Sequence, residues 1–327
     1  MRTFGIKSLF RKAARRLHEN HNSLLGIANT MRLARTYNGI KFRRQAEWRQ
    51  AMYESELLAL LEENGPLARP PIQIRDGWAI DTSMSLPHLN RVLEDSETII
   101  AERAGTRTSR NGSYRSFFQD VWTPADLEKY PSFLDFASSS DVLSAVSHCL
   151  GFIPALSTTI PNGIRFVESN AEFDDQPNQP HDSQLHHIDY YSVPSVYVLV
   201  LLRDTAIENG PWTFLPRSAS HEAAAKLEYW SRKCPFRLCD EKLYSVVDRK
   251  QIIQFCYPRG TVLFIEPSAC FHYGSRNSVK PRFQLMLGYT GVRRTDFSEL
   301  FMPPNVYPIR DTDSRLRKMV LNKNMLP

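Results

Sequence analysis

The sequence lacks any apolar run of the roughly 20 residues that a membrane-spanning helix requires. Its longest such run, YVLVLLR at residues 197–203, has the length of a strand. A disulfide framework is also lacking, because the five cysteines are an odd number and Cys234 and Cys239 stand too far apart for a CxxC motif. No secretion signal is recognisable. These absences favour a reduced, cytoplasmic protein.

Acidic residues are scarce in the first 50 positions. That segment holds twelve Lys and Arg against only Glu19 and Glu47, a net charge of +10. Because the whole chain carries +6, the remainder carries about −4. A basic charge confined to one end argues against a nucleic-acid-binding protein, in which the folded domain itself presents the basic surface.

The segment GIKSLFRKAARRL, residues 5–17, spaces its apolar residues at helical intervals and places basic residues on the other faces. This pattern predicts a basic amphipathic helix. Three interpretations stay open: a cationic helix docked on the core, peripheral binding to an anionic membrane surface or acidic partner through residues 1–50, and an organelle-targeting peptide.

A domain boundary is expected near residue 66. Residues 42–63 predict a long helix, and NGPLARPP at 64–71 ends it. We therefore expect a basic helical arm over residues 1–66 and a folded domain over 67–327. Further helices are expected just after Pro87 and, as support for the domain, over residues 139–150 and 220–233.

Residues from 163 onward predict short strands, because runs rich in β-branched and aromatic residues alternate with turn signals such as ENGP and GSRN. The runs are GIRFVES, SVYVLVLLR, WTFLP, KLYSVV, QIIQFCY, GTVLFIE and RFQLMLGYT. Since regular helical crossovers are missing between them, the expected fold class is mainly β with N-terminal helices, arranged as an antiparallel sandwich or jelly roll.

The stretch QLHHIDYY at residues 184–191 carries candidate metal ligands. In an extended chain, residues two apart share a face, so His187 accompanies Asp189 while His186 faces the other way. One imidazole and one carboxylate are two of the three ligands of a 2-His-1-carboxylate site, which leaves open positions on Fe(II). A shifted register that makes His186 the ligand is the alternative.

The third ligand is expected to be His272, which ends the strong strand run beginning at GTVLFIE. The other downstream histidines fit less well: His148 falls in a helix, His181 in a polar loop and His221 at a helix start. Ten residues after His272, Arg282 opens the last strand run. A planar guanidinium suits bidentate capture of a carboxylate, as an iron-bound cosubstrate with a distal carboxylate requires.

The stretch from Ser183 to His221 resembles the core motif of the phytanoyl-CoA dioxygenase-like family, Fe(II)- and 2-oxoglutarate-dependent oxygenases on a double-stranded β-helix. The family's metal His-x-Asp, ENGP and PGSH motifs correspond here to HID at 187–189, ENGP at 208–211 and PRS at 216–218. Its distal HGS-x-x-N and later arginine correspond to HYGSRN at 272–277 and Arg282. The resemblance covers roughly residues 72–292. The chain departs from the family at Arg217, which replaces a glycine, and at Tyr273, which is inserted after the histidine.

This resemblance implies an oxygenase that uses Fe(II), 2-oxoglutarate and O₂, releases succinate and CO₂, and hydroxylates a small-molecule substrate or one of lipid or glycan type. The residues that it implicates are His187, Asp189 and His272 for the metal, and Arg282, Ser275 and Gln184 for 2-oxoglutarate. Retention of Asp189 favours hydroxylation over halogenation. The alternative is a non-catalytic or 2-oxoglutarate-independent jelly-roll binding protein tethered by the basic arm, which the altered PRSASH turn favours.

Overall fold

The computed structural model describes residues 12–13, 15–16, 25–105, 116–160, 163–176 and 179–326. The basic helix expected over residues 5–17 lies largely outside these described residues. None of the described helices combines the length and apolar character needed to cross a membrane.

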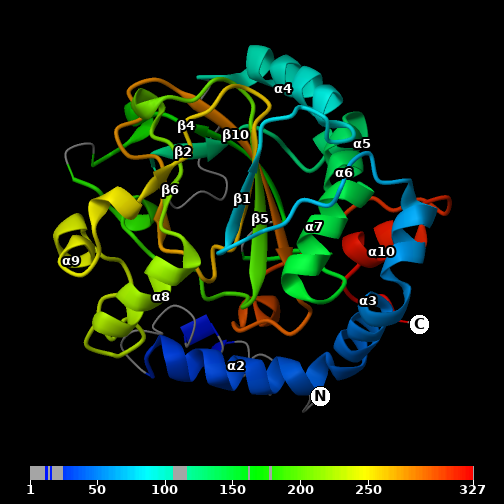
Figure 1. Ribbon diagram of the computed structural model, residues 1–327, viewed down its shortest axis with the longest axis horizontal. Coiled ribbons are helices and arrows are strands. Elements are labelled where there is room, and N and C mark those ends of the chain that lie inside the picture. Colours follow the sequence, from blue (N-terminus) through cyan, green and yellow to red (C-terminus); the bar gives the residue numbers. More distant parts are fainter. Residues whose placement is uncertain are drawn as a thin grey trace.

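An antiparallel sheet forms the centre of the molecule (Figure 1). The long strand β10 lies within it, hydrogen-bonded to both β5 and β4 along most of its length. A short strand, β3, also pairs with the end of β10. In spatial order, the strands are β1 (Trp78–Asp81), β8 (Val262–Ile265), β5 (Ser195–Leu201), β10 (Arg282–Thr290), β4 (Ile164–Ser169) and β2 (Phe118–Asp120), with β3 (Ala155–Leu156) beside β10.

A smaller antiparallel sheet faces the first. It consists of β7 (Ile253–Gln254), β6 (Thr213–Phe214) and β9 (His272–Tyr273). Its register pairs Phe214 with His272. The sheet is short, yet it fixes the position of the histidine expected as the third metal ligand.

Strand β5 separates two layers of the core because its side chains alternate between faces. Val196, Val198 and Val200 belong to the cluster on the helical side of the sheet. Tyr197 and Leu199 belong to a second cluster, which includes residues of the smaller sheet. An uninterrupted apolar run therefore buries both of its faces.

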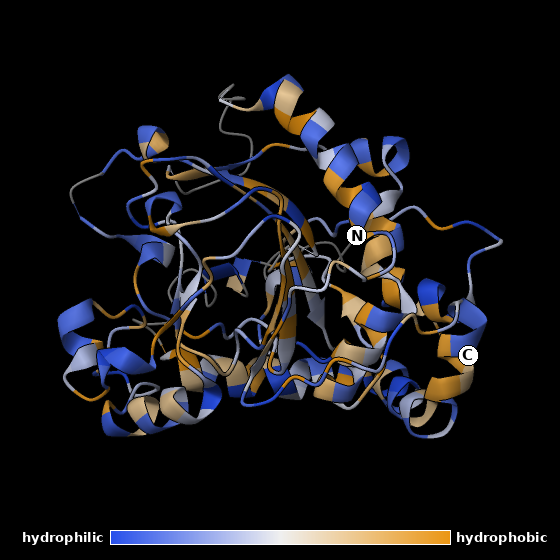
Figure 2. Ribbon diagram, turned by 45° about the horizontal axis from the view of Figure 1, so that its top comes forward, coloured by the Kyte–Doolittle hydropathy of each residue, from blue (hydrophilic) through white to orange (hydrophobic). Residues whose placement is uncertain are grey.

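Helices cover the face of the larger sheet that points away from the smaller sheet, and α8 and α9 flank the smaller sheet (Figure 1). Figure 2 shows that the central strands are mostly hydrophobic, while many of the surrounding helical turns alternate between hydrophilic and hydrophobic residues. The helices are α2 (Ile27–Lys41), α3 (Arg43–Asn64), α4 (Leu89–Arg103), α5 (Asp126–Lys129), α6 (Ser132–Ala137), α7 (Ser140–Leu150), α8 (Arg217–Lys226), α9 (Asp240–Tyr244) and α10 (Arg315–Leu321). Short 3₁₀ turns span Ala171–Phe173, Asp182–Gln184, Ile207–Asn209, Arg249–Gln251 and Ser298–Leu300.

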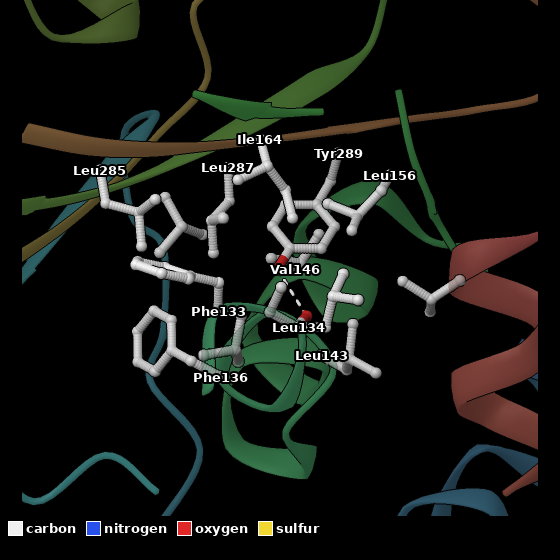
Figure 3. Close-up of a cluster of buried hydrophobic side chains, with 14 of the residues drawn as sticks. Phe133, Leu134, Phe136, Leu143, Val146, Leu156, Ile164, Leu285, Leu287 and Tyr289 are labelled. Atoms are coloured by element: carbon white, nitrogen blue, oxygen red, sulfur yellow. Dashed lines mark hydrogen bonds between the residues drawn. The ribbon is translucent and has the colours of Figure 1, made fainter. Parts of the chain in front are cut away.

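The main core lies between this sheet and helices α6 and α7. Figure 3 shows Phe133 and Val146 from the helices directed toward Leu285 and Leu287 of β10. Tyr289, on the same face of the strand, donates a hydrogen bond of 2.6 Å to the carbonyl of Ala137. The Tyr289 ring is buried in the core while its hydroxyl bonds the last residue of α6, so this hydrogen bond fixes how α6 lies on the sheet.

The buried side chain of Arg49 ties α3 to the body of the protein. Its guanidinium donates to the carbonyl oxygens of Ile153, Pro154, Met319 and Asn322, at 2.5–3.2 Å. Burial lowers the pKa of Arg49 to about 9. Residues of α3 also join the main core, so part of the segment expected as an arm packs in the core. The boundary at residue 66 stays a prediction.

Two of the expected elements differ in the structure. The helix expected over residues 220–233 is α8, which begins at Arg217 and ends at Lys226, and Glu228 just beyond it has a positive φ of 47°. The strand expected at KLYSVV is wrong, because that run enters helix α9, whose first turn carries Asp240 and Glu241. Acidic residues stabilise a helix start.

The antiparallel sheet and its accompanying helices agree with the expected architecture, but the mainly β class understates the helices. Among the described residues, helical positions outnumber strand positions. Helix α2, for which we had no sequence signal, accounts for part of the difference; its N-cap residue is Gly26 and makes no side-chain cap.

Burial predicts the stability effect of two identical substitutions. Leu287→Ala, at a fully buried position of β10, should lower the free energy of unfolding by about 2–5 kcal/mol, because it leaves a cavity against the helices. Leu58→Ala, on α3 with the side chain 70% exposed, should change it by less than about 0.5 kcal/mol. Urea denaturation followed by circular dichroism measures both, and equal losses would contradict the packing described.

Candidate metal centre

Three side chains that could bind a metal meet beside the smaller sheet. Each of His187, Asp189 and His272 offers a ligand atom, and these atoms lie within 4.8 Å of one another. Asp189 Oδ1 is 3.7 Å from His187 Nε2 and 4.0 Å from His272 Nε2. The structure thus brings together the three residues that the sequence indicated as ligands.

Main-chain hydrogen bonds hold the two histidines opposite each other. The amide of His187 donates to the carbonyl of His272 at 3.1 Å, and the amide of His272 donates back at 3.0 Å. This reciprocal pair is the hydrogen-bonded type of antiparallel bridge. It places side chains 85 residues apart in sequence on the same side of the backbone, with ring centroids 4.3 Å apart.

The tautomer of each histidine suits metal binding. Nδ1 of His187 lies 2.8 Å from the carbonyl oxygen of Leu185, and Nδ1 of His272 lies 2.9 Å from that of Cys270. Because a carbonyl only accepts, each Nδ1 carries a proton, so in the neutral ring it is Nε2 that offers the lone pair. Donation of Nδ1–H to the backbone is a common support for a metal-bound imidazole.

The carboxylate of Asp189 is oriented in a similar way. Tyr197, on the inter-sheet face of β5, donates from its hydroxyl to Oδ2 at 2.5 Å. Oδ1 remains directed toward the two imidazoles. All three ligand residues are at most 8% exposed. Two neutral nitrogens and one anionic oxygen at close range therefore fit a divalent first-row metal such as Fe(II).

His186 lies outside this group. Its Nε2 is 3.0 Å from Asp240 Oδ1, and its ring packs edge-on against Tyr273 with centroids 4.7 Å apart. Burial is the largest influence on the His186 ring and lowers its pKa, although Asp240 opposes the shift. Arg276 also donates to Asp240 at 2.6 Å. His186 thus anchors the segment around α9 beside the ligand pair.

Arg282 is a buried cation with donor capacity to spare. Nη1 donates to the carbonyl of Gly210 at 2.5 Å, and Nη2 donates to the hydroxyls of Ser169 and Ser275 at 3.2 and 3.0 Å. Its Nε is buried without a hydrogen-bond partner, and no described carboxylate forms an ion pair with it. Burial lowers the pKa of Arg282 to about 10, so the side chain is still charged at neutral pH.

Trp212 connects the ligand pair with Arg282. Its ring stacks on His272 at a centroid distance of 4.4 Å and an interplanar angle of 16°. A Cβ at Gly274 would lie 2.9 Å from the Trp212 ring and 3.5 Å from Arg282 Nη2. Only glycine therefore allows the indole and the guanidinium to approach the backbone this closely.

The other two residues expected at the 2-oxoglutarate site lie near Arg282 but differ in what they contact. Ser275 contacts the guanidinium directly, as described above. The side chain of Gln184 is already engaged: its nitrogen donates to Asp174 and to the carbonyl of Ser275, and its oxygen accepts from the amide of His181. Gln184 thus positions Ser275 within the protein.

Sequence reasoning missed the contacts of Tyr197 and Trp212. A signal was present for the first, because Tyr197 is the one hydroxyl-bearing side chain within the apolar run VYVLVL, and its face follows from alternation along the strand. Trp212 carries no comparable local signal. Its stacking on His272 depends on pairing between β6 and β9, which the sequence does not encode locally.

A second group of potential ligands, Asp174, Asp175 and His181, lies nearby. His181 Nε2 is 3.6 Å from Asp174 Oδ1, and Asp175 is 56% exposed. Ser116 and Gln184 already donate to these carboxylates. The group is therefore a polar network at the surface beside the buried site.

No family model matches the sequence, and no curated protein matches it significantly. Among solved structures, the chain is similar to EctD from S. alaskensis with 2-oxoglutarate and 5-hydroxyectoine, at 16% identity over 66% of this chain and 72% of that chain, with a TM-score of 0.42. It is also similar to the non-heme alpha-ketoglutarate-dependent epimerase SnoN from nogalamycin biosynthesis, at 14% identity over 79% of this chain and 94% of that chain, with a TM-score of 0.42. A third similar structure is HygX from Streptomyces hygroscopicus with nickel, 2-oxoglutarate and hygromycin B bound, at 14% identity over 72% of this chain and 86% of that chain, with a TM-score of 0.37. Likeness at this level identifies neither the family nor the reaction of this chain.

The two adjacent histidines should differ in metal binding. His187→Ala removes a ligand and should weaken binding of Fe(II) at least about 100-fold, measured by anaerobic calorimetry. His186→Ala should leave the affinity nearly unchanged, because this ring faces Asp240. Equal losses in the two variants would show that the ligand is not His187 alone.

Tyr197→Phe should weaken metal binding about tenfold, since the carboxylate of Asp189 loses the hydroxyl that orients it. Tyr257→Phe is the matched control, because Tyr257 packs against the same inter-sheet cluster. Calorimetric affinities of the two variants, compared with the thermal stabilities of their metal-free forms, separate loss of orientation from loss of folding. Unchanged affinity in Tyr197→Phe would mean that the hydrogen bond plays no part in binding.

Proposed function

We propose that this protein is an Fe(II)- and 2-oxoglutarate-dependent oxygenase that hydroxylates a small-molecule substrate. The observation that carries the proposal is a buried two-histidine, one-carboxylate cluster beside a buried arginine that has donor capacity left. The sequence resemblance to phytanoyl-CoA dioxygenase-like proteins points the same way. In this proposal, the two sheets correspond to the double-stranded β-helix of that family.

The ligand cluster supports iron as the metal. Three protein ligands leave three positions of an octahedral ion for cosubstrate and O₂, which a structural metal site would not do. Both imidazoles are already in the metal-binding tautomer, and Asp189 is already oriented by Tyr197. Such preorganisation lowers the cost of binding. Presence of the carboxylate favours hydroxylation over halogenation.

Arg282 supports a cosubstrate with a distal carboxylate. A guanidinium with Nε–H unpaired can bind a carboxylate without giving up its hydrogen bond to the Gly210 carbonyl. The hydroxyls of Ser169 and Ser275 accept from Nη2 and share a hydrogen bond of 2.7 Å, which leaves one hydroxyl proton of the pair to donate to the same anion. Burial keeps competing water away and strengthens the pairing. 2-Oxoglutarate has the required geometry, with one end able to chelate a metal and a carboxylate at the other.

The chemistry that bound iron would supply is the activation of O₂ coupled to decarboxylation of 2-oxoglutarate. The protein's own part is to orient its ligands and shield them from bulk water. Phe236, whose ring lies 6.0 Å from that of His187, and the buried Tyr190 bring an apolar surface to the ligand pair. We expect the reacting carbon of the substrate to pack against the rings of Phe236 and Tyr190. An amphiphilic or glycan-linked substrate could place an apolar carbon there.

The proposal predicts conversion of 2-oxoglutarate to succinate by the Fe(II)-loaded protein, detected by NMR even without substrate. Arg282→Gln should raise the apparent Kd for 2-oxoglutarate at least about 100-fold, since charged hydrogen bonds are lost, while Fe(II) affinity is retained. Arg282→Lys should recover only part of this binding, because lysine lacks the planar fork. Arg203→Gln, at a half-exposed arginine of the same charge, is the control.

Two outcomes would overturn the proposal. If Fe(II) binds but neither wild type nor Arg282→Gln binds 2-oxoglutarate, the protein is a metal-binding jelly roll that does not use this cosubstrate. If neither Fe(II) nor 2-oxoglutarate binds, the non-catalytic binding protein is the better description.

A further inference from the structure

Helix α2 has two faces of different character. Its buried positions are Ile27, Thr30, Ala34 and Asn38, which follow one side of the helix. On the other side, Leu33 is 50% exposed and Ile40 is 76% exposed. Because seven residues make nearly two turns, these two aliphatic side chains lie in one stripe on the solvent face.

Cations are exposed near this stripe. Arg32 lies about 100° around the helix from Leu33, Arg35 lies on the side of the helix away from Leu33, and α2 contains no acidic residue. Beyond its C-terminal end, Arg44 is exposed, and the exposed Arg43 pairs with Glu47 at 2.8 Å. The helix thus presents aliphatic side chains within a positively charged surface, in a segment of the sequence whose net charge is +10 over residues 1–50.

The inner face of α2 fixes this surface relative to the metal centre. Ile27 packs in the cluster that contains Ile188 and Tyr190, the two neighbours of Asp189. Farther along, the amide of Asn38 donates to the carbonyl oxygens of Arg294 and Asp296 at 3.0 and 2.9 Å. The helix is therefore bound rigidly to the body, and its outer face has one defined orientation.

A hollow of about 770 Å³ lies beside α2 and reaches the segment 192–194, which follows Asp189. Arg35 and Arg293 contribute cationic groups to its lining, Glu47 and Glu54 contribute anionic ones, and Phe152 and Pro194 contribute apolar surface. The segment from Ser192 to Pro194 begins three residues after Asp189. The hollow therefore connects the surface beside α2 with the segment that follows the metal ligand.

We propose that the outer face of α2 docks on an anionic lipid bilayer and holds the metal centre at the membrane surface. The arginines meet the phosphate-bearing head groups, while Leu33 and Ile40 enter the apolar boundary just below them. A soluble polyanion would satisfy the charges but would offer no apolar phase to the two aliphatic side chains. The bilayer is the partner that matches both features.

The test is co-sedimentation of the full-length protein with vesicles of phosphatidylcholine, alone or with 30 mol% phosphatidylglycerol as the probe. Wild type should bind only the anionic vesicles. Leu33→Ser/Ile40→Ser and Arg32→Gln/Arg35→Gln should each lower the partition coefficient about tenfold. Added salt should weaken wild-type binding, because surface charge is screened.

Matched controls separate this face from general stickiness and net charge. Leu58→Ser/Val306→Ser changes two aliphatic residues that are 70% and 84% exposed elsewhere. Lys250→Gln/Arg310→Gln removes two exposed positive charges elsewhere. Both control proteins should bind like wild type. Hydrogen exchange should also show residues 27–41 protected by anionic vesicles, a readout that requires neither iron nor turnover.

Several results would overturn the proposal. No binding to anionic vesicles, or equal binding to neutral ones, would remove the lipid surface as the partner. Wild-type binding by Leu33→Ser/Ile40→Ser, together with displacement from vesicles by soluble polyglutamate, would point to an acidic protein. Because vesicle binding is independent of Fe(II) and 2-oxoglutarate, failure here leaves the oxygenase proposal standing, and the reverse also holds.

Discussion

The reciprocal pair of main-chain hydrogen bonds between His187 and His272 is the constraint on which the candidate site depends. It joins a segment that precedes β5 to a strand of the smaller sheet, and it sets both imidazoles on one side of the backbone. Asp189 then needs only the two-residue repeat of an extended chain to join them. Without that bridge, nothing in the backbone would hold His272 next to His187 and Asp189.

Buried cations are a second recurring feature, and their partners differ with their positions. Both terminal nitrogens of Arg49 donate to carbonyl oxygens, including those of Pro154 and Met319, and so link α3 to α10, although its Nε is buried without a partner. Arg294 pairs with the carboxylate of Asp296. Arg282 has hydroxyls and one carbonyl around it, but no described carboxylate partner. Arg49 also lacks a described carboxylate partner, so what distinguishes Arg282 is its surroundings: two serine hydroxyls and Gly274, against which Trp212 also lies.

The α2 helix links the surface of the protein to this interior. Its inner residues pack beside the neighbours of Asp189, and its outer residues combine arginines with exposed aliphatic side chains. Under the proposed docking, this one 15-residue helix would link the membrane surface to the surroundings of the metal ligands. An oxygenase held in this way would meet amphiphilic substrates at the interface where they are most concentrated.

The sequence by itself determined the local features: the long apolar strands β5 and β10, the helices α3, α4 and α7, and the alternation that sets His187 apart from His186. These follow from periodicity and caps within a few residues. Tertiary structure alone decided that α2 packs as a helix on the body, that Trp212 stacks on His272, and that the face of β5 carrying Tyr197 meets Asp189. Those outcomes depend on which distant segments pair, and pairing energies between segments 85 residues apart leave no periodic signal in either segment.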